Sequence, residues 1–116
     1  MRIKGIDVVF YWVTDLDRAL EFYTGALGIE AGIRHGTWQE MNVPGTTRFA
    51  LHGGSPGQHS VNAVVSFIVS DLDAALAELA NKGHQPTGEI TITGRARFAE
   101  YADPDGNLVH LLEHLS

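Results

Sequence analysis

The chain has 116 residues, a formal net charge of −6 and no cysteine. This length suits one domain, 1–116, and the missing cysteines exclude disulfides, thiolate metal sites and cysteine nucleophiles. The acidic charge argues against nucleic acid as a partner, because phosphate contacts need a basic patch.

The opening segment, MRIKGIDVVFYWV, carries an apolar run. The run is too short to span a membrane and lacks a small-residue cleavage site, so we interpret it as a strand. We therefore expect a cytoplasmic protein with no membrane partner.

An internal duplication organises the chain. Residues 8–20 read VVFYWVTDLDRAL and residues 64–76 read VVSFIVSDLDAAL, an offset of 56 residues (71 minus 15). Each copy starts with an apolar run typical of a strand covered on both faces. A helix-start signal follows, with Thr14 and Ser70 as the expected N-caps and a carboxylate three residues later.

Each predicted helix has apolar residues at helical spacing and ends at a glycine, Gly28 or Gly83, where a left-handed cap is expected. Strand-like segments with turn residues between them follow at about 30–35, 37–43, 47–52, 86–92, 95–102 and 107–114. The order βαβββ, present twice, predicts an α+β fold of curved mixed sheets around a cavity, with helices on the outer face. We place repeat one at 1–53, a linker at 54–60 and repeat two at 61–116.

Both faces of the first strand are apolar, with Phe10 and Trp12 on one face and Tyr11 on the other. A helix can cover only one face, so the other must line a dry interface or a ligand cavity. Two such half-cups could close over a small molecule within one chain or between two chains. The pattern does not decide between these arrangements.

Three features together resemble the vicinal oxygen chelate superfamily, which includes glyoxalases, extradiol dioxygenases and bleomycin-resistance proteins. They are the duplicated strand followed by [ST]DLD, the Glu21-Phe22-Tyr23…Leu27-Gly28 helix end, and the Asp103-Pro104-Asp105-Gly106-Asn107 turn. The resemblance covers essentially the whole chain. It supports the fold more strongly than any one function, because the superfamily is chemically diverse.

The resemblance also implies four metal-ligand positions on inward-facing strand residues. Here they fall at Val8, at Ala50 (or His52 if the register is shifted by two), at Val64 and at His110. Valine cannot bind a metal ion, so at most two ligands remain. We therefore expect a cup with neither metal nor cofactor.

The metal-poor pattern favours a binding protein of the bleomycin-resistance type, associated with antibiotic resistance. It would sequester a largely apolar or aromatic small molecule and work as a homodimer. The alternative is an enzyme of the glyoxalase or dioxygenase type, a lyase or isomerase, in which His110 is a ligand or a general base. An accessory protein that holds a biosynthetic intermediate also fits, so whether the chain is an enzyme stays open.

The candidate catalytic residue is His110, which the resemblance places in the cup; the other interpretation is a buried neutral histidine bonded to a neighbour. Trp12 and Trp38 could stack on a planar ligand, although core packing is the standard use of tryptophan. Arg48 could pair with Glu40 within the cup or as a solvated cross-strand pair. The candidate ligand-binding residues are Phe10, Trp12, Trp38, Arg48, His52, Ser66, Tyr101 and His110.

Overall fold

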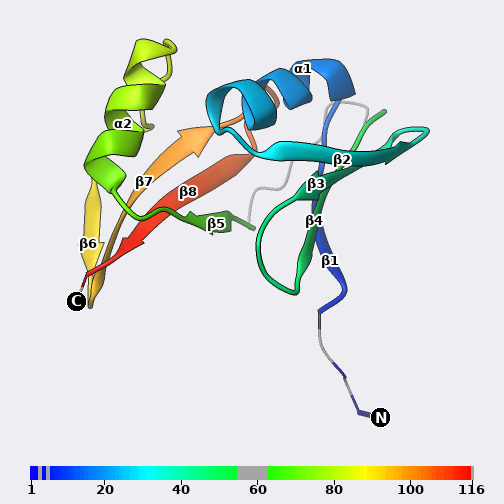
Figure 1. Cartoon of the computed structure of the whole chain (residues 1–116), viewed down its shortest axis with the longest axis horizontal. Coiled ribbons are helices and arrows are strands. Elements are labelled where there is room, and N and C mark those ends of the chain that lie inside the picture. The colour runs from blue at the N-terminus through cyan, green and yellow to red at the C-terminus, as the bar shows by residue number, and fades with distance from the viewer. Residues whose placement is uncertain (3, 5, 55–62, 116) are drawn as a thin grey trace. The chain divides into compact units, whose positions relative to one another are not determined.

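The computed structural model describes residues 1–2, 4, 6–54 and 63–115. The chain divides into two compact units, Met1–His59 and Ser60–Ser116, and each unit carries one copy of the repeat (Figure 1). Apart from Gly54, the expected linker lies outside the described residues. That the two repeats form one domain around a cavity stays a prediction.

The first unit contains a four-stranded sheet in the order β1-β4-β3-β2. Strand β1 runs parallel to β4, and the other neighbours are antiparallel, so the sheet is mixed as predicted. The strands are β1 (Val8–Trp12), β2 (Glu30–His35), β3 (Trp38–Asn42) and β4 (Arg48–His52). Their bounds agree with the predicted segments because turn residues mark each strand end.

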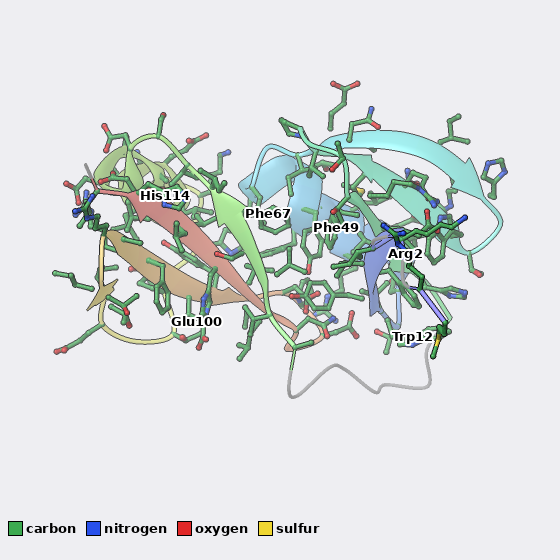
Figure 2. All side chains as sticks on the ribbon, turned by 90° about the horizontal axis from the view of Figure 1, so that it is seen from below. Arg2, Trp12, Phe49, Phe67, Glu100 and His114 are labelled. Carbon is green, nitrogen blue, oxygen red and sulfur yellow. The ribbon has the colours of Figure 1, made fainter. Side chains whose placement is uncertain are left out.

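One helical segment covers one face of this sheet. Helix α1 (Leu16–Leu20) continues directly into a π-helical segment, η1 (Glu21–Ala26), whereas the sequence predicts one regular helix. Tyr23 of η1 packs against Tyr11 and Phe49 of the sheet, with ring centroids 6.4 and 5.7 Å apart. Phe49, labelled in Figure 2, lies between the sheet and the helical segment and is buried. These aromatic residues form the core of the first unit.

The second unit repeats this plan, with strand order β5-β8-β7-β6. Strand β5 runs parallel to β8, and the remaining pairs are antiparallel. The elements are β5 (Val65–Ile68), α2 (Leu72–Asn81), β6 (Thr91–Thr93), β7 (Ala96–Ala102) and β8 (Leu108–His114). Helix α2 covers one face of the sheet (Figure 1) and buries Leu72 and Leu79.

Strand β6 is much shorter than the predicted segment 86–92. Pro86 and Gly88 interrupt that segment, and proline cannot donate a hydrogen bond to a strand ladder. Only three residues, Thr91–Thr93, therefore pair with β7.

The predicted helix N-caps are wrong by one residue. Asp15 accepts hydrogen bonds from the backbone amides of Asp17 and Arg18 at 3.1 and 3.2 Å, and Asp71 accepts one from the amide of Ala74 at 3.0 Å. Both caps have extended backbone, and their carboxylates also face the positive end of the helix dipole. The aspartates therefore take the role that the hydroxyl residues were expected to have.

The predicted helix ends are confirmed. Gly28 and Gly83 have φ values of 72° and 86°, the left-handed region that a C-terminal cap requires. None of the helices in the described ranges has the length and apolar content of a membrane span.

Candidate functional site

The uncovered face of the first sheet is aromatic. Strand pairing sets Phe10 opposite Ala50 and Trp12 opposite His52, and His52 is also opposite Trp38 on β3. We call Phe10, Trp12, Trp38 and His52 the aromatic face. They point away from the helix because side chains alternate between the faces of a strand.

The rings of the aromatic face contact one another. Phe10 lies edge-on to Trp12 and Trp38, with ring centroids 5.7 and 5.0 Å apart. The His52 ring is 4.1 Å from Trp12 and 5.6 Å from Trp38. Aromatic pairs in such geometries stabilise one another. The four rings therefore form one connected surface supported by the rigid sheet.

This surface stays open to solvent. Phe10 and Trp12 are 36% and 44% exposed, whereas Tyr11, between them on β1, is 1% exposed on the helix side. Ala50 is fully buried and forms the floor of the aromatic face. The small residue at the centre and the partly exposed rings around it leave apolar ring surface available to a ligand.

A polar group borders the aromatic face. Glu40 accepts hydrogen bonds from the indole nitrogen of Trp38 and from Arg48, whose Nη2 lies 2.6 Å from the carboxylate. Arg48 also pairs with Asp7 at 3.1 Å. The bond from Arg48, followed by that from Trp38, lowers the pKa of Glu40 below its ordinary value. The predicted pair of Glu40 and Arg48 is thus present, and it fixes the Trp38 ring.

The corresponding face of the second sheet is different. His110, on β8, lies opposite Ser66 of β5 on one side and Glu100 of β7 on the other. His110 Nε2 is 2.9 Å from a Glu100 carboxylate oxygen, and Thr87 donates a hydrogen bond of 2.8 Å to the other oxygen. The bond from His110, then that from Thr87, lowers the pKa of Glu100. The Phe98 ring stacks on His110, 4.3 Å away with an interplanar angle of 17°.

The candidate residues thus fall into two groups and one exception. Phe10, Trp12, Trp38, Arg48 and His52 share one face of the first sheet, and Ser66 and His110 share one face of the second. Tyr101 does not join them. It is 1% exposed, pairs with Val109 and lies on the opposite face of β7 from Glu100. Burial raises the pKa of its hydroxyl, which fits a role in the core.

Sequence reasoning missed Glu100 as the partner of His110, and Thr87 as the donor to Glu100. Glu100 has the strand parity of Phe98, and that parity is a signal for its facing the same side as His110. Its pairing with His110 depends on the register between β7 and β8, which turn chemistry alone does not specify.

The structure does not fit the metal site that the resemblance implies. Strand pairing identifies Ala50 as the counterpart of His110, because Phe10 and Ser66, 56 residues apart, face these two residues. Val8, Ala50 and Val64 have no ligand atoms in their side chains. Within the described ranges, no three His, Cys, Asp or Glu residues cluster in a way that could hold a metal ion.

Comparisons with known proteins agree with the fold. A model of the Glyoxalase/Bleomycin resistance protein/Dioxygenase superfamily matches residues 5–111. The YetH protein of Bacillus subtilis (strain 168) is 25% identical over 119 residues, which cover 96% of this chain and 99% of that protein.

Solved structures extend the likeness. TnmS3, an antibiotic binding protein from Streptomyces sp. CB03234, is 25% identical with a TM-score of 0.79, and the match covers 98% of each chain. A superfamily member from Sphaerobacter thermophilus DSM 20745 is 25% identical with a TM-score of 0.76, covering 97% of this chain and 98% of that one. The likeness therefore extends over nearly the full length of each chain.

Proposed function

Because this chain belongs to the glyoxalase/bleomycin resistance protein/dioxygenase superfamily, we propose that it binds a small, largely apolar or aromatic molecule without a metal ion. The observation that carries the proposal is the aromatic face, which leaves Phe10 and Trp12 partly exposed on a rigid sheet. The likeness to TnmS3, which is described as antibiotic binding, supports a ligand of the same general kind.

The energetics favour a planar ligand. Covering exposed apolar surface contributes roughly 25 cal/mol per Å². The rings already hold one another in place, so little side-chain freedom remains to be lost on binding. A flat molecule that stacks on one of the Phe10 and Trp12 rings, whose planes are 73° apart, meets the other ring edge-on and gains both the area term and the ring contacts.

The polar border can orient such a ligand. The Glu40 carboxylate has both oxygens engaged by Arg48 and Trp38, which makes it a fixed acceptor beside the rings. A donor group on the ligand would find its acceptor already positioned. An apolar surface bordered by a small number of fixed polar groups is typical of small-molecule sites.

The absence of metal chemistry is part of the proposal. Val8, Ala50 and Val64 stand where the resemblance implies ligands, and none can bind a divalent ion. A metal-dependent lyase or isomerase is therefore not the function that these residues support. Elemental analysis of protein purified without a metal-affinity tag tests this part, and one tightly bound equivalent of metal would contradict it.

We further propose a cytoplasmic homodimer. Large apolar side chains remain exposed in each unit, including Ile33 (67%) and Ile68 (72%), and apolar surface of this kind favours association. Light scattering behind a sizing column measures the mass directly, and a particle of one chain would contradict the dimer.

Fluorescence gives a specific test of ligand binding. The chain contains two tryptophans, and both lie on the aromatic face, so quenching of tryptophan emission reports on this surface. A panel of planar aromatic compounds, including naphthalene and acridine derivatives, is titrated into the full chain. Phe10→Ala should weaken the binding of a hit about tenfold or more, which corresponds to roughly 1.4 kcal/mol.

The control is Ile92→Ala, which removes an apolar side chain from the second unit that is more exposed than Phe10, 73% against 36%. It should leave the dissociation constant unchanged. Equal weakening by both substitutions, or saturable binding that leaves tryptophan emission unaltered, would show that the aromatic face is not the binding site.

A further inference from the structure

Ser66, His110 and Glu100 form one row across the second sheet. The strand register sets Ser66 of β5 opposite His110 of β8, and His110 opposite Glu100 of β7. All three side chains therefore leave the same face at the same level, with the imidazole between a hydroxyl and a carboxylate. The row lies wholly within the second unit, and Glu100 is labelled in Figure 2.

The carboxylate determines which nitrogen of His110 is basic. An ionised glutamate can only accept hydrogen bonds, and the pKa of Glu100 is lowered, so the proton of the 2.9 Å contact belongs to His110 Nε2. In the neutral ring the other nitrogen, Nδ1, is then the acceptor. Nδ1 has no hydrogen-bond partner among the described residues.

Two neighbours hold this arrangement in place. Thr87 donates to the second oxygen of Glu100 and fixes the carboxylate. Phe98 stacks nearly parallel to the imidazole and limits rotation of the ring. Since Nε2 faces β7, the free nitrogen is directed away from Glu100, toward the side of the sheet where β5 lies.

Ser66 supplies a hydroxyl on that side. Its side chain is exposed and makes no hydrogen bond within the part of the chain that the structure describes. Strands β5 and β8 are paired and parallel, and neighbouring strands lie about 5 Å apart, so a rotation about the serine side-chain bond can bring its oxygen toward Nδ1. Such contacts often tighten only when substrate binds.

We infer that Ser66, His110 and Glu100 constitute an acyl-transfer site that accepts activated esters. Ser66 is the nucleophile, His110 is the base and Glu100 is the positioning residue. A base that is oriented in this way makes a weakly nucleophilic hydroxyl reactive. This activity goes beyond ligand binding and uses neither a metal ion nor the aromatic face.

The reaction balances with water as the second substrate. The serine oxygen attacks the ester carbonyl while its proton passes to Nδ1. The bond between the acyl carbon and the alcohol oxygen breaks, and the alcohol leaves with that proton. Water then attacks the acyl-serine while one of its protons passes to His110 Nδ1. The bond between the acyl carbon and Ser66 Oγ breaks, Oγ takes the proton from Nδ1, and the carboxylic acid leaves.

The test uses the full chain and p-nitrophenyl acetate. We expect a burst of p-nitrophenolate stoichiometric with protein and an acetyl group on the Ser66 peptide by mass spectrometry, since acyl-enzyme accumulation produces a burst. Ser66→Ala should abolish both signals, and His110→Ala should lower the acylation rate about 100-fold or more. Ser70→Ala, at another exposed serine of this unit, is the matched control.

Glu100→Gln tests the positioning role. It should lower kcat with little change in KM, and Glu100→Asp should restore part of kcat. A fall in kcat that comes together with a rise in KM would instead indicate a structural effect. Thermal unfolding of each variant verifies that the unit is folded.

Hydrolysis that persists in folded Ser66→Ala, or an acetyl group spread over surface residues, would overturn the inference. A folded wild-type protein with neither burst nor label would overturn it as well. Phe10→Ala separates the two proposals, because it should weaken aromatic ligands and leave the burst intact.

Discussion

The central row of each sheet has the same geometry but different residues in the two units. Phe10, Ala50 and Glu40 cross the middle of the first sheet, and Ser66, His110 and Glu100 cross the second. Glutamate occupies the same place in both rows. Its partner differs, because the residue on the central strand is alanine in one unit and histidine in the other.

This difference sets the chemistry of each face. Alanine cannot bond to Glu40, so the carboxylate turns to Arg48 and Trp38 and fixes an aromatic surface. Histidine bonds to Glu100 directly and becomes an oriented base. One duplicated backbone can thus carry a binding surface in one copy and a reactive row in the other, because function depends on the site more than on the fold.

The largest expected effect separates the two faces of β1. Tyr11→Ala should lower the free energy of unfolding by about 3–5 kcal/mol, because it removes a buried ring that packs on Tyr23 and Phe49. Phe10→Ala should cost roughly 1 kcal/mol or less, because its ring is already partly in solvent. Chemical denaturation of both variants makes the comparison. Equal losses would mean that Phe10 belongs to the core rather than to a binding surface.

A second prediction concerns the residue at the centre of the row, which is changed in the first unit to the histidine of the second. Ala50→His puts an imidazole opposite Glu40, at a site with no exposed area, and should cost about 1–3 kcal/mol through overpacking. If the new ring bonds to Glu40 as His110 bonds to Glu100, the double variant with Glu40→Gln will show a coupling energy of about 0.5 kcal/mol or more. Additive losses would mean that more than the central residue distinguishes the rows.

Much of the fold was predictable because its signals are local. The apolar runs and turn residues predict the strands, and Gly28 and Gly83 predict the helix ends from a requirement for positive φ. The N-caps were not predictable from preference alone, because Ser, Thr and Asp are all good capping residues and the backbone angle decides among them. The π-helical segment η1 also has no distinct sequence period to announce it.

The parts of the candidate site that depend only on the alternation of side chains along one strand were predictable. Phe10 and Trp12 share a face by strand parity, which the sequence shows directly. Glu100 meets His110 only because β7 and β8 pair in one particular register, and a shift of one residue would put Tyr101 there instead. Register depends on the whole sheet, which is why the contact between Glu100 and His110 was not predicted.

A smaller effect tests whether the two helices begin alike. Asp71→Ala should lower the free energy of unfolding by about 1 kcal/mol, because the amide of Ala74 loses its acceptor. Ser70→Ala should change it by less than about 0.5 kcal/mol, as expected for an exposed substitution outside the cap. Asp15→Ala should match Asp71→Ala if the repeats are capped in the same way. A larger loss from Ser70→Ala would restore the hydroxyl as the cap.

The smallest expected effect is a change in stability at acidic pH. The bond from Arg48 lowers the pKa of folded Glu40 below its ordinary value of 4.5, so the pair stabilises the fold above that pH. Stability is lost as the pH falls through the lowered folded pKa, because protonation removes the charge that Arg48 needs. Glu40→Gln lacks this contribution, so its difference from wild type should shrink on acidification below pH 4.5.

Glu89→Gln makes the same charge change at an exposed residue outside any ion pair of the described chain, and its difference from wild type at neutral pH should be smaller. Denaturation curves at neutral and acidic pH measure both. A Glu40→Gln difference that stays constant would mean that Arg48 is held by Asp7 alone. The aromatic face would then lack the fixed acceptor that orients its ligand.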